Sequence, residues 1–233
     1  MKVEIWSDVV CPWCYIGKRR FEKALAGFPH EVEVTYHSFE LDPSAPVTSG
    51  ETVTDSLAQK YGGHERVAAM QEHVRRQAAE EGLTFRLEET PHANTIDAHR
   101  LLHLALAEGG REQQARLKET LLAAYFEDAR DLSDHAVLRE IAVAQGLDEA
   151  RVDEVLGSRE YADAVRSDVA QAAAYGATGV PFFVFEGKYA VSGAQPTEVF
   201  GQVLEQVREA TQPTPVTVVA GATGDVCGPE GCD

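Results

Sequence analysis

The sequence predicts an α/β fold in which one α/β unit is interrupted by a long helical insertion. Alternating apolar residues predict strands near both ends of the chain, at residues 2–7, at residues 32–39 and twice within residues 179–193. Between these strands, apolar residues recur with helical spacing from about Thr52 to Tyr175. The predicted α/β unit comprises residues 1–50 and 177–211. The helical insertion covers residues 51–176, and a C-terminal tail covers residues 212–233.

The helices are predicted from their apolar spacing and from residues that suit helix ends. Asn94 is a suitable N-cap, Asp134 is another, and Gly109-Gly110 suits the end of a helix. Two strands within residues 179–193 are expected to join at a tight turn on Glu186-Gly187. The predicted helices cover residues 12–26, 54–62, 64–81, 94–108, 111–130, 134–146, 148–156, 159–175 and 196–210.

Composition and charge exclude several classes of partner. The 233 residues carry 38 acids against 21 bases, a formal net charge of -17, which disfavours nucleic acid and anionic membrane. No apolar run has the length of a membrane span, and the residues after Met1 do not resemble a secretion signal. We therefore expect a cytoplasmic protein, in a compartment that keeps thiols reduced.

The sequence Cys11-Pro12-Trp13-Cys14 follows the first predicted strand and opens the first predicted helix. With Cys11 as N-cap and Pro12 as the first helical residue, free N–H groups and the helix dipole favour the thiolate form of Cys11. Cys11 is therefore the expected nucleophile, and Cys14, which we expect to be more buried, the resolving thiol. Trp13 offers a flat apolar surface to a peptide or a small aromatic ligand.

Proline also marks the start of the third predicted strand. Pro181 lies at the beginning of that strand, a position where proline is tolerated. A cis Val180–Pro181 bond would turn the backbone groups of Val180 outward. Those groups could then pair with an extended substrate beside Cys11, so Val180 and Pro181 are candidate site residues.

Five segments carry a family resemblance, at residues 7–25, 37–43, 91–105, 176–185 and 190–200. In this order they resemble the FrnE-type dithiol oxidoreductases, within the DsbA-like branch of the thioredoxin superfamily. The resemblance implies a thioredoxin fold with a large all-helical insertion, and protein disulfide oxidoreductase or isomerase activity. It implies that Cys11 attacks, that Cys14 resolves, that Pro181 is a cis-proline, and that Asn94 and Phe39 line the substrate groove.

Related enzymes define the rival functions. The 2-hydroxychromene-2-carboxylate isomerases and kappa-class glutathione transferases resemble this chain, but typically carry serine where it has Cys11. That difference favours exchange with thiol or disulfide proteins over glutathione-dependent chemistry on a small aromatic or polyketide-type compound. No cofactor or metal is expected, although glutathione remains a candidate co-substrate. A non-enzymatic binding module that uses Trp13 is a second alternative.

A second cysteine pair lies in the tail. Cys227 and Cys232 flank the glycine- and proline-rich sequence GPEG, which permits a tight loop, so the two thiols could bond to each other. Some FrnE-like proteins carry a similar C-terminal pair, which favours an auxiliary redox couple that exchanges with Cys11 and Cys14. Metal binding by this pair, or no role, is left open.

Other polar residues are expected to have ordinary roles. His99 and His103 have the i, i+4 spacing of metal ligands, but the sequence offers no clear third ligand, so packing is favoured. His37 is expected to be structural. Surface positions are expected for Lys18, Arg19, Arg20 and the acidic pairs Glu80-Glu81 and Glu88-Glu89.

Overall fold

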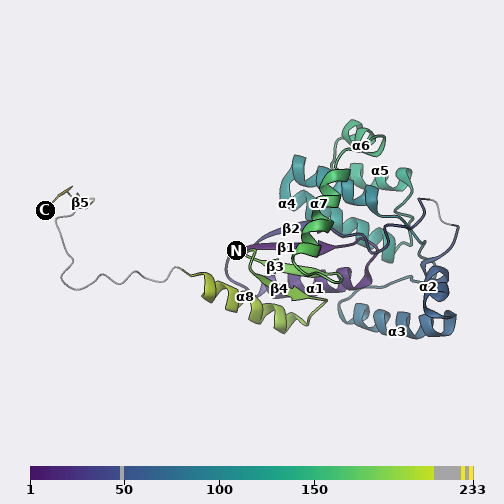
Figure 1. Ribbon diagram of the computed structural model, residues 1–233, viewed down its shortest axis with the longest axis horizontal. Helices are drawn as coiled ribbons and strands as arrows, with labels where there is room; N and C mark the ends of the chain where they lie inside the picture. The colour runs from purple at the N-terminus through teal and green to yellow at the C-terminus, as the bar shows by residue number, and fades with distance from the viewer. Residues whose placement is uncertain (48–49, 213–226, 229–230, 233) are drawn as a thin grey trace.

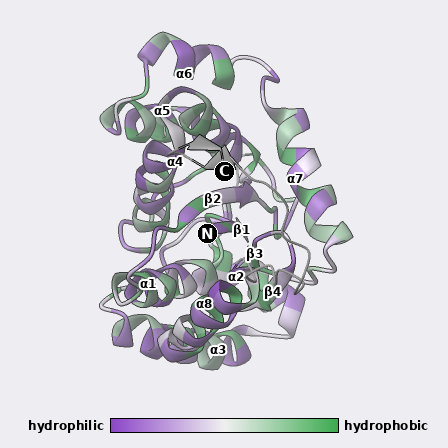
Figure 2. Ribbon diagram, turned by 90° about the vertical axis from the view of Figure 1, so that its left-hand side faces the viewer, coloured by the Kyte–Doolittle hydropathy of each residue, from purple (hydrophilic) through white to green (hydrophobic). Residues whose placement is uncertain are grey.

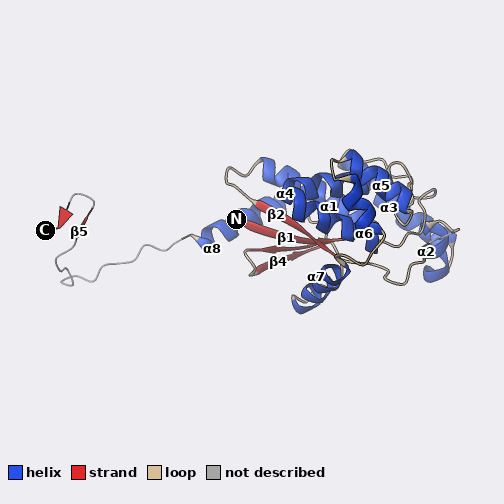
Figure 3. Cartoon of the chain, turned by 90° about the horizontal axis from the view of Figure 1, so that it is seen from above, coloured by secondary structure: helices blue, strands red, loops and turns tan. Residues whose placement is uncertain are grey.

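The computed structural model describes residues 1–47 and 50–212, and the backbone of 227–228 and 231–232. It contains a four-stranded sheet with helices on both faces (Figures 1 and 3). Strand order is β2-β1-β3-β4, with β1 and β2 parallel and the other pairs antiparallel. The strands are β1 Lys2–Ser7, β2 Glu33–Ser38, β3 Phe182–Phe185 and β4 Tyr189–Ser192.

Alternation along the strands gives the sheet two apolar faces. One face, which includes Val3 and Ile5, packs against α1 (Pro12–Ala26) and α8 (Thr197–Thr211). The other face, which includes the wholly buried Trp6, packs against α7 (Ala162–Ala174). Figure 3 shows α1 and α7 on opposite sides of the sheet. The fold therefore buries β1, whose last residue leads into the Cys11 motif.

The helices α2 to α7 lie in the chain between β2 and β3. Of these helices, α3 to α6 form one apolar core with the start of α1, and this core includes the wholly buried Leu101, Leu117 and Leu121. Figure 2 shows hydrophilic and hydrophobic residues on each of these helices, as expected for helices that are buried on one side only. Those not yet given are α2 Val53–Tyr61, α3 His64–Glu80, α4 Ile96–Phe126, α5 His135–Ala144 and α6 Glu149–Leu156.

Local structure follows the predictions closely, although the N-cap of α4 is Thr95 rather than the predicted Asn94. The predicted turn is confirmed, because Glu186 and Gly187 have φ values of 52° and 64° between β3 and β4. The two helices predicted at residues 94–108 and 111–130 follow each other in α4, and Gly110 separates them with non-helical dihedral angles (φ 71°, ψ -170°). Glycine relieves the steric cost of that positive φ, so the break predicted at Gly109-Gly110 is confirmed.

Two further findings concern the C-terminal tail and the possibility of a membrane-spanning helix. The backbone of the tail forms a short antiparallel pair, β5 Cys227–Gly228 and β6 Gly231–Cys232, in which Cys227 lies opposite Cys232. Within the described residues, no helix has both the length and the apolar character that crossing a bilayer requires. The prediction of an α/β fold with a large helical insertion is confirmed.

Candidate redox site

Cys11 lies at the point where β1 gives way to α1. Its φ and ψ of -94° and 114° are those of an N-cap, and Pro12 occupies the first turn of the helix. The backbone N–H of Cys14 donates to the Cys11 carbonyl at 3.0 Å. Both cysteines are free thiols and each is 3% exposed. We expected Cys14 to be more buried than Cys11. This expectation is wrong, because the exposed fractions of the two residues are equal.

Val180 and Pro181 lie directly against Cys11. The Val180–Pro181 bond is cis, and the Cys11 thiol donates to the Val180 carbonyl with an Sγ–O distance of 3.6 Å. A Cβ on Gly17 would lie 3.0 Å from Pro181 Cγ, so glycine allows α1 to pack against the proline ring. The N–H of Gly193 also donates to the Pro181 carbonyl at 2.8 Å. Residues far apart in sequence thus meet at one thiol.

Phe39 and Asn94 are the two residues that the family resemblance assigns to the substrate groove, and their surroundings differ. Phe39 packs in the cluster formed by Trp6 and Phe182, together with Val180, so it lies beside the proline loop. Asn94 uses both ends of its side chain internally, because its Nδ2 donates to Ala45 O at 2.9 Å and its Oδ1 accepts from Ile96 N at 3.0 Å. Asn94 therefore shapes the start of α4, and a substrate contact for it stays a prediction.

Pro12 and Trp13 are half-buried at the mouth of the site. Both line a cavity that separates the α1 N-terminus from α2 and α3. The ring of Trp13 lies 5.7 Å from the ring of His73 on α3. Trp13 therefore connects the cysteine motif with the helical insertion.

Three buried ionisable side chains surround the cysteines; of these, His99 was expected only to pack, and Asp8 and Lys118 were not predicted from the sequence. Asp8, three residues before Cys11, is wholly buried and accepts from Leu41 N at 2.8 Å. One of its carboxylate oxygens lies 3.2 Å from Nε2 of the buried His99. Lys118 on α4 is 1% exposed and donates to the Ser7 carbonyl at 3.2 Å.

Burial and the neighbouring charges shift the pKa values of these groups in opposite directions. Burial raises the pKa of Cys14 well above its usual value, the hydrogen bond and charge of Cys11 raise it further, and the Lys118 charge opposes them. Burial lowers the pKa of Lys118 to about 8, although the charges of Cys14, Asp8 and Cys11 favour its protonated form. Burial would raise the pKa of Asp8, but His99, Leu41 and Lys118 outweigh it and the pKa is lowered. The site thus holds Cys14 as a thiol beside a cation and a carboxylate.

The basic residues of α1 correct another expectation. Lys18 and Arg20 are buried at 5% and 8% exposure, so their predicted surface positions are wrong. Lys18 and Arg19 pair with Glu119 on α4, and Arg20 pairs with Glu81 at 2.7 Å. The side chains of Lys18 and Arg20 therefore do not extend into solvent. Their ion pairs hold α1 against α4 and against the end of α3.

The histidines have structural partners, as expected. His37 stacks on Trp6 with ring centroids 4.5 Å apart, and its Nδ1 lies 2.8 Å from Asp168. His103 Nε2 lies 3.0 Å from the same carboxylate. In the described part of the chain, no three His, Cys, Asp or Glu side chains are arranged to hold a metal ion. The side chains of Cys227 and Cys232 lie outside the described residues, so their role stays a prediction.

Signals for the missed residues exist in the sequence. Lys118 follows Leu117 and interrupts the apolar stripe that continues to Leu121 and Tyr125. A charged residue in such a stripe is either paired or placed near a functional group. Asp8 ends an apolar strand just before the cysteine motif, where a carboxylate is costly to bury without a partner.

Comparison with known proteins agrees with this geometry. A probable DsbA oxidoreductase of Streptomyces coelicolor is 46% identical, with a TM-score of 0.85 over 100% of this chain and 98% of its own. The uncharacterised protein YwbO of Bacillus subtilis (strain 168) is 30% identical over 205 residues, covering 87% of this chain and 94% of that protein. The cytosolic disulfide reductase DsbM of Pseudomonas aeruginosa shares the fold at 18% identity, with a TM-score of 0.62 over 90% of this chain and 100% of its own.

The family model of the DSBA-like thioredoxin domain matches residues 2–205, which include both cysteines of the motif and the cis-proline. The chain is therefore a member of the DsbA-like thioredoxin family.

Proposed function

We propose that this protein is a thiol–disulfide oxidoreductase or isomerase that acts through Cys11 and Cys14. The observation that carries the proposal is the contact of Cys11 Sγ with the Val180 carbonyl, at 3.6 Å, beside the second free thiol. Cys11 has the helix N-terminus behind it, which favours the attacking thiolate. The family supports disulfide oxidoreductase chemistry in general, and the roles of individual residues are part of the proposal.

The oxidising direction uses the Cys11–Cys14 disulfide. A substrate thiolate attacks Cys11 Sγ, the S–S bond breaks, and its electron pair goes to Cys14, which takes a proton. A second substrate thiolate then attacks the substrate sulfur of the mixed disulfide and displaces the Cys11 thiolate. The substrate leaves as a disulfide, and the enzyme keeps two electrons as the reduced pair.

The reducing or isomerising direction starts from the Cys11 thiolate. It attacks a substrate disulfide and releases one substrate thiolate, and Cys14 then resolves the mixed disulfide after losing its proton. Because the pKa of Cys14 is raised, this deprotonation is the step in which the Lys118 charge helps most. In the described residues, Val180 N–H has no hydrogen-bond acceptor, which leaves it free to pair with an extended substrate.

The proposal includes partners and a compartment. The substrates are thiol or disulfide proteins or glutathione, and the compartment is the cytoplasm, where disulfides form transiently. Cys227 and Cys232 would act as an auxiliary couple that reoxidises or reduces Cys11 and Cys14. The backbone register, in which Cys227 lies opposite Cys232, is compatible with this pairing.

The reduction potential of the Cys11–Cys14 pair tests the proposal. The protein and its Cys227→Ala, Cys232→Ala variant are equilibrated with glutathione redox buffers, and the disulfide fraction is measured by mass spectrometry. A reversible two-electron transition is expected. A reduction potential near that of thioredoxin would indicate a reductase, and one nearer that of protein disulfide isomerase would indicate an oxidase or isomerase. If no Cys11–Cys14 disulfide forms, glutathione-dependent chemistry on a small aromatic compound replaces the proposal.

Lys118→Met is expected to lower the reduction potential of Cys11–Cys14. Lys118 favours negative charge on Cys11 when that residue attacks as a thiolate, so loss of Lys118 destabilises the reduced form. At an effective dielectric constant near 20, an interaction over several ångströms is on the order of 1–2 kcal/mol, or roughly 20–40 mV for two electrons. The same titration against glutathione measures the shift.

The control for this variant is Lys188→Met, which removes the same charge from the exposed turn between β3 and β4. Lys118→Met is not expected to unfold the protein, because Lys118 has no ion pair among the described residues and methionine fills similar volume. An unchanged potential in Lys118→Met, with its fold intact by circular dichroism, would contradict the electrostatic role.

A further inference from the structure

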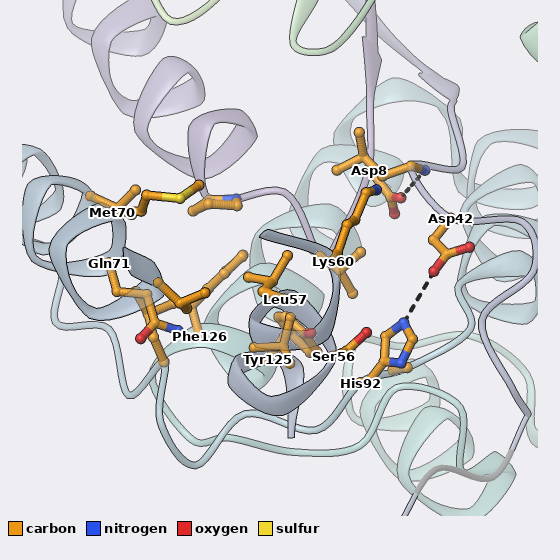
Figure 4. A pocket seen from close by; sticks show the side chains of 18 of the residues that line it. Asp8, Asp42, Ser56, Leu57, Lys60, Met70, Gln71, His92, Tyr125 and Phe126 are labelled. Atoms are coloured by element: carbon orange, nitrogen blue, oxygen red, sulfur yellow. Dashed lines mark hydrogen bonds and ion pairs between the residues drawn. The ribbon is translucent and has the colours of Figure 1, made fainter. Parts of the chain in front are cut away.

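A cavity of about 320 Å³ lies beside the redox motif, outside the thiol contacts described above. Trp13 and Pro12 form one wall, and α2 and α3 form the opposite wall. Figure 4 shows side chains of α2, α3 and α4 directed into the same space. This volume is at the lower end of the range of small-molecule sites, and its lining is mostly apolar.

The two helices present their apolar faces to the cavity. On α2, Val53, Leu57 and Tyr61 recur at intervals of four and line it, whereas Ala58 is the only residue of this helix that is buried. On α3, Val67 and Val74 share the cavity face. A helix normally covers its apolar face with protein, so the face of α2 is incompletely packed, whereas Val67 on α3 is wholly buried.

Exposed apolar residues gather at the same place. Leu41, Tyr61 and Met70 are 45%, 38% and 42% exposed, and all three line this cavity. They are half of the six large apolar side chains that are exposed among the described residues. Such a concentration beside a concave site marks a binding surface.

The two acidic side chains of the lining already have partners within the protein. Asp8 accepts from Leu41 N and lies beside His99, and Asp42 accepts from Ser44 and lies 3.2 Å from His92. Gln71 donates to Thr54 at 2.7 Å. Lys60 lies at the exposed rim of the cavity, and among the interactions of the described residues its ammonium contacts the Tyr61 ring at 5.8 Å and forms no ion pair with a carboxylate. Figure 4 shows the Lys60 side chain beside Leu57 in the cavity.

We propose that this cavity binds a small organic acid, with its apolar body between Trp13 and the α2–α3 faces and its carboxylate on Lys60. An apolar body buries the open faces, and the carboxylate supplies the partner that Lys60 lacks. The paired Asp8 and Asp42 offer no free anion for a cationic ligand. This site is additional to the proposed redox function and does not depend on it.

Binding of octanoate tests the proposal, with 1-octanol as the neutral probe of the same chain length. Emission of Trp13 reports binding, because Trp13 lines the cavity and Trp6 is wholly buried on the sheet. We expect octanoate to bind more tightly than octanol, and Lys60→Met to weaken octanoate about three- to fivefold while leaving octanol unchanged. Ser56→Phe, which adds volume to the cavity lining, is expected to weaken both probes.

Lys188→Met is the matched control, since it removes a charge remote from the cavity and should leave octanoate binding unchanged. Equal loss in Lys60→Met and Lys188→Met, or no loss in Ser56→Phe, would place the probe elsewhere and overturn the proposal. No binding of either probe would also overturn it. These titrations use reduced protein and require no thiol–disulfide exchange. A failure of the redox proposal therefore would not change their outcome.

Discussion

Replacing Cys11 by alanine is expected to abolish thiol–disulfide exchange, with a rate loss of at least about 10³-fold. Cys11 is the thiol in contact with the Val180 carbonyl, and it lies at the N-terminus of α1, where a thiolate is stabilised. Alanine leaves Cys14 as the remaining thiol of the motif, with a pKa well above its usual value because it is buried. The measurement is the rate at which glutathione reduces a model disulfide peptide.

Cys14→Ala provides the mechanistic contrast. Cys11 keeps its position and still attacks, but the mixed disulfide has no internal thiol to resolve it. A stable Cys11 adduct with glutathione or peptide is therefore expected by mass spectrometry, and it should be absent in Cys11→Ala. Turnover retained in Cys11→Ala would instead favour a binding module built on Trp13, and adducts on Cys14 would reverse the assigned roles.

The sequence predicted the parts of this site that are local in the chain. The cysteine motif could be placed because a strand, an N-cap, a proline at the first helical position and an amphipathic helix follow in order within Lys2–Ala26. The hairpin at Glu186-Gly187 was likewise readable, since both positive φ values are set by the turn itself. Each of these features depends on neighbouring residues.

The sequence did not predict contacts that depend on helix packing in space. Lys118 reaches the Ser7 carbonyl because α4 crosses behind β1, across 111 positions in the chain. The same packing buries Lys18 against Glu119, although its position on α1 indicated a solvated face. Periodicity states which side of a helix is apolar, but not which charged groups another helix will bring to it.

The network around Asp168 is the other place where a single change should have a large effect. Its carboxylate accepts from Ser38 N at 2.7 Å and lies within 3.0 Å of His37 Nδ1 and His103 Nε2. Burial would raise the pKa of Asp168, but His103, His37 and Ser38 outweigh it and the pKa is strongly lowered. Burial would also lower the pKa of His37, but the hydrogen bond and charge of Asp168 raise it. One carboxylate thus fixes α7 to β2 and α4.

Asp168→Asn is expected to lower the free energy of unfolding by roughly 1–2 kcal/mol at pH 5.5, because it leaves the partly buried His37 imidazolium with Glu4 as its remaining carboxylate partner. Urea unfolding followed by circular dichroism measures the change. Asp163→Asn is the matched control, since Asp163 lies on the same helix with its side chain 89% exposed.

The pH dependence separates the charge from the hydrogen bonds. The depressed Asp168 contributes stability above its unfolded pKa near 3.8, and this is lost as the pH falls further through its folded value. The raised His37 contributes stability below its unfolded pKa near 6.5, and this is lost as the pH rises through its folded value. The difference between wild type and Asp168→Asn should therefore be greatest between about pH 4 and 6.5 and shrink above pH 7. A difference that is constant across this range would assign the stabilisation to the Ser38 hydrogen bond and to packing, and would contradict the ionic role of His37.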